Sequence, residues 1–333
     1  MIKDNKKCVL HIGAPKTGST SLEKFLFGNQ DKLTENGWFY PCATVRGYGH
    51  HDLAYLVSGS YPDWALPQDK TFDELLEELH NAITDHSKII LSSEIYYMYS
   101  KPADVAKMLE YLGIPIANVR IILYIRRQDE AHLSWYNQRV KAQGYTDSIN
   151  NSIDDSFGLW DYRQKLSPWQ KVFGRDSITL RIYEKEKLAG GDVRNDFLTA
   201  IDVEVSGFQW PEQEVNTRLC SDILEFQRLV NKLPLEPLQK RKFREKLMLL
   251  SESSKNTGLF DDLPLLDNNK RERILESYAK SNAEVARDYF QRDLLFDDAM
   301  PNHAEKTTAR CGLDVEKLGL ILGWILLGQQ DRD

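Results

Sequence analysis

The sequence predicts an α/β fold in which a parallel sheet is flanked by helices and followed by a mostly helical C-terminal part. Short apolar runs rich in β-branched residues alternate with longer amphipathic stretches over the first half of the chain, which is the rhythm of βαβ units. After residue 220 the apolar residues recur almost wholly at helical spacing. We expect strands at 8–12, 88–92, 119–125 and 177–183.

The first expected strand leads into a turn that suits an anion. Residues 8–27 read CVLHIGAPKTGSTSLEKFLF, and an amphipathic helix is expected over 20–35 directly after the turn. Free backbone N–H groups, the positive end of the helix dipole, Lys16 and several hydroxyls converge there. The segment therefore predicts a P-loop-like site for a phosphate-like group.

The lysine of this turn differs in position from that of nucleotide triphosphate loops. Those loops read G-x-x-x-x-G-K-[ST]. Gly13 and Gly18 share the spacing, but Ser19 takes the lysine position and Lys16 lies inside the turn. No aspartate suited to Mg²⁺ stands at the expected strand ends. These differences argue against an ordinary kinase or ATPase.

A second cationic segment follows the strand expected at 119–125. Arg126 comes directly after that strand, and Ser134 lies eight positions later on an expected helix. Together the two segments resemble the sulfotransferases that use 3′-phosphoadenosine 5′-phosphosulfate (PAPS). In that family a PKxGTT-like loop binds the 5′-phosphosulfate, and an arginine followed eight residues later by a serine binds the 3′-phosphate. Residues 15–20 (PKTGST) match the first pattern, and Arg126 with Ser134 matches the second.

The resemblance extends over roughly two-thirds of the chain, as a likeness of fold. Residues 161–184, 192–198 and 271–296 resemble later helices and a strand of the family. Two departures stand out. Ser21 replaces a tryptophan that stacks on adenine in the cytosolic small-molecule enzymes, and their C-terminal Arg-Lys-Gly segment has no counterpart. The departures favour the bacterial and carbohydrate-type branches.

The resemblance implies an enzyme that moves a sulfuryl group from PAPS to an acceptor hydroxyl by in-line displacement. We expect this hydroxyl to belong to a carbohydrate. Positioning and charge stabilisation would do most of the catalysis without a metal. Two other classes stay open: a P-loop kinase that uses ATP and Mg²⁺, and a non-catalytic nucleotide-binding protein. The donor-binding residues that the resemblance implies are Lys16, Thr17, Gly18, Ser19, Thr20, Ser21, Arg126 and Ser134.

The acceptor must lose a proton, so we expect a general base, and the sequence offers two candidates. Glu94 follows the strand at 88–92, at the sheet edge where ligands of α/β folds gather. It could equally cap the next helix or pair with a lysine. His51 lies in a Gly- and Tyr-bearing loop, beside Asp52, which could orient its ring. Glu94 is preferred over His51 as the base, and Lys16 is the third catalytic candidate.

The remaining organisation is coarser. We expect helices at 71–85 and 102–112, short strands within the loop 37–66, and mainly helices over 127–172. Residues 251–270 predict a long loop, either a lid over the acceptor or a plain surface connection. The whole chain is expected to be one domain, with an α/β core over 1–215 and a helical extension over 216–333.

Net charge and composition limit the classes of binding partner that the protein is expected to have. The formal net charge of −7 argues against bulk nucleic-acid binding but permits a local basic donor pocket. We expect an acceptor molecule such as a glycan, and the oligomeric state is left open. The apolar stretch 318–327 is too short to span a bilayer and predicts a docked C-terminal helix. With no signal-peptide pattern and four scattered cysteines that predict reduced thiols, a cytoplasmic protein is expected.

Overall fold

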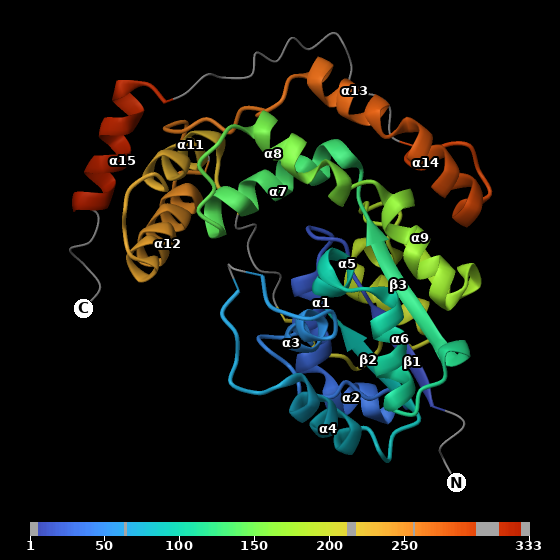
Figure 1. Ribbon diagram of the computed structural model, residues 1–333. Coiled ribbons are helices and arrows are strands. Elements are labelled where there is room, and N and C mark those ends of the chain that lie inside the picture. The colour runs from blue at the N-terminus through green and yellow to red at the C-terminus, as the bar shows by residue number, and fades with distance from the viewer. Residues whose placement is uncertain (1–5, 63–64, 212–217, 256, 298–312, 328–333) are drawn as a thin grey trace. The chain divides into compact units, whose positions relative to one another are not determined.

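The chain forms two compact units that interleave along the sequence (Figure 1). The structure is a computed structural model that describes residues 6–62, 65–211, 218–255, 257–297 and 313–327. The first unit comprises residues 1–126, 159–213 and 280–296, and the second comprises residues 127–158, 214–279 and 297–333. That the whole chain acts as one domain stays a prediction.

The first unit is built on a four-stranded parallel sheet, which confirms the predicted fold class. The strands lie in the order β2–β1–β3–β4. In β1 and β2 every residue after the first is buried, which is typical of a parallel sheet covered by helices on both faces. The strands are β1 (Lys7–His11), β2 (Lys88–Ser92), β3 (Val119–Ile125) and β4 (Ile178–Ile182).

Helices of the first unit flank this sheet. On one face α1 and α10 pack through Phe25 and Phe197 against Val9, Ile122 and Tyr124 of the strands. The helices are α1 (Ser19–Gly28), α2 (Gln30–Glu35), α3 (His51–Leu56), α4 (Phe72–Ala82), α5 (Glu94–Tyr99), α6 (Pro102–Tyr111), α9 (Tyr162–Phe173), α10 (Val193–Ala200) and, from residue 280 on, α14 (Ala279–Val285).

The single helix predicted over 20–35 is wrong, because the chain breaks at Asn29. This residue separates α1 from α2 with φ −122° and ψ 29°. Its buried side chain donates to the carbonyl oxygens of Phe25 and Gln209 and accepts a hydrogen bond from the Gln209 N–H. An asparagine that bonds the backbone in this way competes with continued helix.

The short strands predicted within 37–66 are also absent from the described part of that segment. Two isolated bridges occur there, between Phe39 and Ile89 and between Arg46 and Gly49. The segment instead contains α3. His50, just before that helix, accepts a hydrogen bond from the Ser92 N–H, which ties this segment to the end of β2.

The second unit is helical, as predicted for the C-terminal part. Its core includes Val140, Ile223, Leu247 and Ile321. The helices are α7 (Gln128–Ala142), α8 (Ile149–Ser156), α11 (Ser221–Val230), α12 (Pro237–Ser253), α13 (Asn268–Ser277) and α15 (Val315–Leu327).

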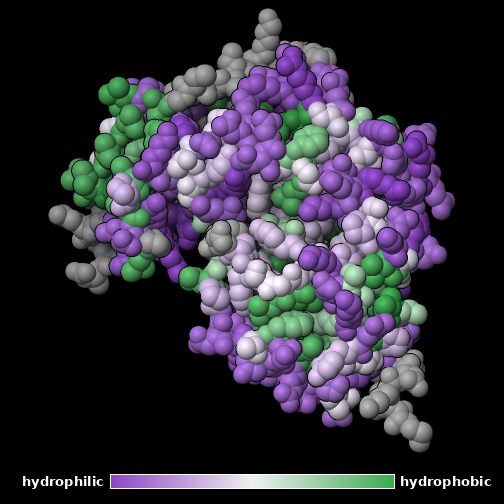
Figure 2. Space-filling view, viewed as in Figure 1, coloured by the Kyte–Doolittle hydropathy of each residue, from purple (hydrophilic) through white to green (hydrophobic). Residues whose placement is uncertain are grey.

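The apolar stretch 318–327 lies in α15 and docks within the second unit. Ile321 is buried, and Leu318, Trp324 and Ile325 pack beside it against the core of this unit. The opposite side of the helix exposes leucines, which form a green area over α15 in Figure 2. Within the described residues, none of the helices combines the length and apolar character needed to cross a membrane.

The loop predicted at 251–270 spans 254–267, between α12 and α13. Its middle is held by α11 and α15: the Asp261 N–H donates to Asp222, Ser221 donates to the Asp261 carbonyl oxygen, and Lys317 Nζ lies 2.6 Å from a carboxylate oxygen of each aspartate. These contacts favour a surface connection over a lid.

The described cysteines are unpaired thiols. Cys8, Cys42 and Cys220 are free, in agreement with the prediction, and Cys311 lies outside the described residues.

Candidate anion-binding site

The anion site predicted from the sequence lies in the first unit, at the carboxyl edge of the sheet. Because β1 has β2 on one side and β3 on the other, the winding direction reverses beside β1. Ligands of parallel α/β sheets bind at such a switch point. The loop 12–18 after β1, Glu94 after β2 and Arg126 after β3 all leave the sheet at this edge.

The loop between β1 and α1 has a wrapped backbone. Lys16 and Gly18 adopt left-handed conformations with φ values of 65° and 79°. The Thr17 hydroxyl donates to the Ala14 carbonyl oxygen at 2.6 Å, so this side chain closes the loop. The first intrahelical bond of α1 runs from the Leu22 N–H to the Gly18 carbonyl oxygen. The N–H groups before Leu22 therefore face the loop without partners from the helix, as at any helix start.

Three charged side chains converge beside this loop. Burial lowers the pKa of Lys16, the nearby Glu94 carboxylate raises it, and the charge of Arg126 lowers it further. Lys16 is therefore close enough to both residues to interact with their charges, although they follow different strands. The sequence placed all three at this edge, and the structure brings them together.

Glu94 is the first residue of α5, but it is not the cap of that helix. Ser93 caps α5 by accepting a hydrogen bond from the Ile95 N–H. Burial raises the pKa of the Glu94 carboxyl, and Lys16 and Ser19 lower it. Ser19 Oγ lies near this carboxylate but makes no hydrogen bond of normal geometry to a described residue. Glu94 thus does not cap α5, and its carboxylate lies close enough to Lys16 for their charges to interact.

The backbone of Arg126 is fixed by a buried tyrosine. The Arg126 N–H donates to the Tyr162 hydroxyl at 3.1 Å, and the same hydroxyl donates to the Arg126 carbonyl oxygen. Tyr162 is fully buried, so this pair holds the residue after β3 in place. Arg126 is the last residue of the first of three segments that make up the first unit.

Tyr183 is a site residue that sequence reasoning missed. A Cβ built on Gly18 would lie 2.9 Å from the Tyr183 ring, so this ring packs directly on the loop. Burial raises the pKa of the Tyr183 hydroxyl, and the charge of Arg126 lowers it. Tyr183 follows β4, and the Tyr-Glu pair at a strand end was its only signal in the sequence.

His51 has partners other than the one predicted. Asp52 accepts hydrogen bonds from Arg46 and Tyr61, rather than orienting the imidazole. His51 Nδ1 lies 2.8 Å from Ser93 Oγ, and its Nε2 lies 3.6 Å from a carboxylate oxygen of Glu23. Burial lowers the pKa of His51 to about 4. Both ring nitrogens thus face protein groups, which favours Glu94 as the base.

The other predicted donor residues differ in accessibility. Thr20 is exposed and Ser21 is half-buried in the first turn of α1. Ser134 is half-buried on α7, which belongs to the second unit. Its pairing with Arg126 rests on the sequence spacing and stays a prediction.

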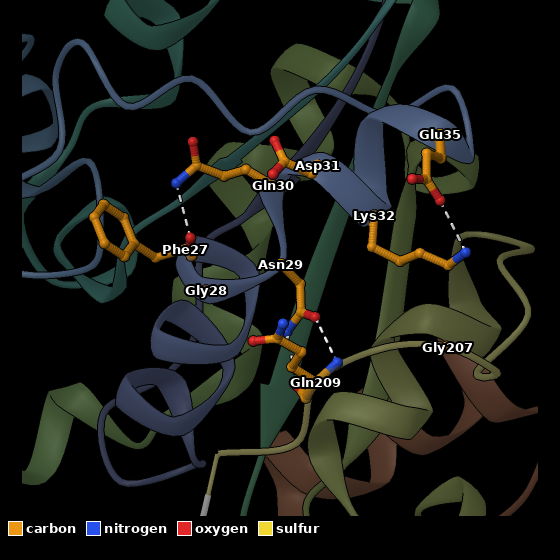
Figure 3. A pocket seen from close by; sticks show the side chains of 9 residues that line it. All are labelled: Phe27, Gly28, Asn29, Gln30, Asp31, Lys32, Glu35, Gly207 and Gln209. Carbon is orange, nitrogen blue, oxygen red and sulfur yellow. Dashed lines mark hydrogen bonds and ion pairs between the residues drawn. The ribbon is translucent and has the colours of Figure 1, made fainter.

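A pocket of about 380 Å³ lies at the opposite end of α1 (Figure 3). Its lining comes from the α1–α2 junction and from Gly207 and Gln209, and it includes the Lys32–Glu35 ion pair. The loop with Lys16 precedes α1, whereas this pocket follows it. The pocket is therefore not the predicted donor site.

Comparisons with known proteins give chains to which this one is similar. A protein of Archaeoglobus fulgidus, described as an uncharacterized protein, is 28% identical over 204 residues, which cover 61% of this chain and 54% of that protein. The chain thus spans about half the length of this relative. The crystal structure of a sulfotransferase from Alicyclobacillus acidocaldarius aligns with a TM-score of 0.43 and 15% identity, over 78% of this chain and 97% of that chain. No protein-family model matches the chain.

Proposed function

We propose that this protein is a sulfotransferase that transfers the sulfuryl group of PAPS to an acceptor hydroxyl. The observation that carries the proposal is the convergence of Lys16, Glu94 and Arg126 beside the start of α1. Two cations and free N–H groups suit an anionic donor. A carboxylate at the same place suits removal of a proton from the acceptor.

The loop has the donors that a phosphosulfate needs. Ser19 Oγ is buried beside the Glu94 carboxylate, and it would have to turn from that carboxylate to donate to a ligand oxygen. Lys16 and Ser19 would hold the 5′ end together with the N–H groups that precede Leu22. Thr17, Gly18, Thr20 and Ser21 would form the rest of this donor site, as the motif implies. The donor, when bound, supplies an activated sulfuryl group.

Arg126 would bind the 3′-phosphate through its planar guanidinium, which matches phosphate oxygens. Tyr162 fixes the backbone of this residue on both sides. Ser134 is proposed as the second contact to the same phosphate on the strength of its spacing alone.

Glu94 is proposed as the general base. Its carboxylate would take the proton of the acceptor hydroxyl as the oxygen bonds to sulfur. Burial raises its pKa toward the range in which a carboxylate is an effective base. Lys16, which neighbours it, would stabilise the charge that develops on the leaving phosphate.

We propose a carbohydrate acceptor, because an aromatic cluster lies near Glu94. The Tyr55 ring centroid lies 5.3 Å from that of Tyr61 and 6.0 Å from that of Tyr99. Burial raises the pKa of Tyr55, and the charges of Tyr99 and Glu94 raise it further, which places the cluster close to this carboxylate. Tyr99 is 41% exposed. Aromatic faces with polar edges suit sugar rings.

A transfer assay tests this proposal. Labelled PAPS is incubated with panels of glycans, phenols and lipids, and we expect label to appear on glycans. Lys16→Ala should lower the rate by about 100-fold or more, because the developing charge loses its cation. Lys107→Ala removes an exposed lysine of α6 that pairs with Asp104, and it should leave the rate unchanged. A folded wild-type protein that labels none of the three panels would refute sulfuryl transfer.

A further inference from the structure

His11 carries a buried polar atom that the proposed reaction does not use. It is the last residue of β1 and is fully buried. Its Nδ1 lies 2.7 Å from Ser92 Oγ at the end of β2. Its Nε2 has no hydrogen-bond partner among the described residues. Because an unpaired buried polar atom is costly, such an atom beside a loop that suits anions points to a ligand.

The free nitrogen of His11 borders the anion loop. A Cβ built on Gly13 would lie 2.9 Å from His11 Nε2 and 2.9 Å from Ser19 Oγ. Both atoms therefore surround one point above Gly13, just before the ten-residue helix α1. Both are buried, and neither makes a hydrogen bond of normal geometry to a described residue. Because both distances are below 3.0 Å, any side chain at position 13 would force His11 or Ser19 to move.

Ser92 connects His11 to a buried carboxyl. Its Oγ lies 3.1 Å from Glu23 Oε1, and Glu23 is 3% exposed. A serine hydroxyl has one proton, so it donates to only one of its two neighbours at a time. The position of the protons along Glu23, Ser92 and His11 is therefore coupled.

Two arrangements of protons satisfy the hydrogen bonds among Glu23, Ser92 and His11. When Glu23 is protonated, it donates to Ser92, Ser92 donates to His11 Nδ1, and the ring proton lies on Nε2, facing the loop. When these three side chains together lose one proton, that proton leaves from His11 Nε2. The Glu23 proton then passes to Ser92, and the Ser92 proton passes to His11 Nδ1. Glu23 is then ionised, and Nε2 presents a lone pair, which repels an anion.

The groups around Glu23, Ser92 and His11 favour the first arrangement, in which Glu23 is protonated. Burial and the charge of Glu94 raise the pKa of Glu23, and its bond with Ser92 lowers it. Burial lowers the pKa of His11 to about 3, so the ring is neutral. Packed around the chain are Ser19 and Glu23 from α1, Tyr40, His51 from α3, Ser92 from β2, Glu94 from α5, Tyr124 from β3 and Phe197 from α10.

We propose that His11 binds an oxyanion at the loop through Nε2, and that Glu23, acting through Ser92, is the positioning residue that determines which ring nitrogen of His11 carries the proton. This inference deepens the proposed function, because it assigns a further contact to the anionic donor. It makes anion affinity highest when Glu23 is protonated, and lower as the pH rises and Glu23 ionises.

Nitrogen NMR of histidine-labelled protein tests the coupling without any donor. Long-range ¹H–¹⁵N spectra distinguish the two ring tautomers, and His11→Phe identifies the His11 signals. As the pH rises over the range in which the protein stays folded, we expect His11 to pass from the Nε2–H tautomer toward the Nδ1–H tautomer. A His11 ring that keeps the Nδ1–H tautomer at every pH overturns the proposal.

Variants separate positioning from simple packing. In Glu23→Gln the partner of Ser92 cannot ionise, so the His11 tautomer should no longer respond to pH. Ser92→Ala breaks the chain and should have the same effect if Glu23→Gln does not fold. His80→Gln, in α4, should leave the His11 response unchanged. An unaltered response in Glu23→Gln or Ser92→Ala contradicts the assignment.

Inorganic sulfate then tests binding, because its charge is constant over this pH range. We expect sulfate to shift the Nε2 signal of His11, and to bind roughly tenfold more weakly to His11→Phe, as the loss of one bond to a charged ligand predicts. Sulfate that leaves Nε2 unshifted overturns the contact. Since neither readout uses PAPS, failure of this proposal is distinguishable from failure of sulfuryl transfer.

Discussion

At the scale of single residues, Glu94 has neighbours that change its proton affinity in opposite directions. Burial favours the neutral carboxyl, whereas Lys16 favours the carboxylate. The balance leaves its pKa above that of an ordinary glutamate, and the pKa of Lys16 below that of an ordinary lysine. A carboxyl with a raised pKa beside an amine with a lowered pKa is characteristic of groups that exchange protons in catalysis.

The protonation of Glu94 should determine the acidic side of the pH–rate profile. The base acts only when ionised, so turnover should fall as the pH falls through its raised pKa, and on the alkaline side it should fall as Lys16 loses its proton. Glu94→Gln should lower turnover by about 10²–10⁴-fold and remove the acidic limb, with binding of adenosine 3′,5′-bisphosphate retained.

His51→Gln is the comparison for this prediction. It should reduce turnover far less than Glu94→Gln, because both nitrogens of His51 already face Ser93 and Glu23. The opposite order of effects, measured under saturating donor, would assign the base role to His51.

Charged residues that follow strands were the site residues that sequence could identify. Lys16, Glu94 and Arg126 stand within a few positions of the ends of apolar runs, so the edge rule of parallel sheets places them together. His11, Glu23 and Tyr183 could not be identified in this way. Their roles depend on contacts with Ser92, Gly13 and Gly18. Only the assembled sheet and its register create these contacts.

At the scale of elements, the start of α1 depends on Gly18. Its φ of 79° is a left-handed conformation that a residue with a Cβ adopts at a cost. A Cβ there would also lie 2.9 Å from the Tyr183 ring. Gly113 has a similar φ of 74° but open space around the added atom, so it isolates the backbone cost.

Gly18→Ala should therefore lower the free energy of unfolding by more than Gly113→Ala does. Gly113→Ala should cost about 1 kcal/mol and leave binding of adenosine 3′,5′-bisphosphate unchanged. Gly18→Ala should also weaken that binding, by roughly tenfold or more, because Tyr183 and the loop must move. Urea unfolding and calorimetry measure the two effects. Equal affinities in the two variants would show that the loop does not hold the ligand.

Sequence patterns predicted most elements but not their interruptions. The four strands lie within one residue of their predicted positions, because buried parallel strands are uniformly apolar. The break of the helix 20–35 at Asn29 was missed, since it depends on hydrogen bonds to Gln209, about 180 positions away in the chain. The periodicity of apolar residues contains no information about such a partner.

At the scale of the whole molecule, a chain with a net charge of −7 concentrates cations at one edge of its sheet. The net charge makes general attraction of polyanions unfavourable, whereas the loop, Lys16 and Arg126 offer a local site for a small anion. Selective binding of one nucleotide with two anionic ends is consistent with both features.

The interleaving of the two units was beyond sequence reasoning. Residues 280–296 return to the first unit, where Asp288 accepts a hydrogen bond from Arg163 at 2.8 Å and Ser281 donates to Asp161 at 2.6 Å. These pairs join positions more than a hundred residues apart, and charged residues at helical spacing have many equivalent partners in a sequence. Fold class follows from local patterns, but this return of the chain does not.

The measurement that tests the central claim most directly is calorimetric titration with adenosine 3′,5′-bisphosphate in the presence of a metal chelator, compared with ATP and Mg²⁺. The two cationic groups at the sheet edge should bind the bisphosphate more tightly, and Lys16→Ala and Arg126→Ala should each weaken binding by roughly tenfold or more. Tighter binding of ATP with Mg²⁺, or an affinity for the bisphosphate that neither variant changes, would contradict the account and favour a kinase.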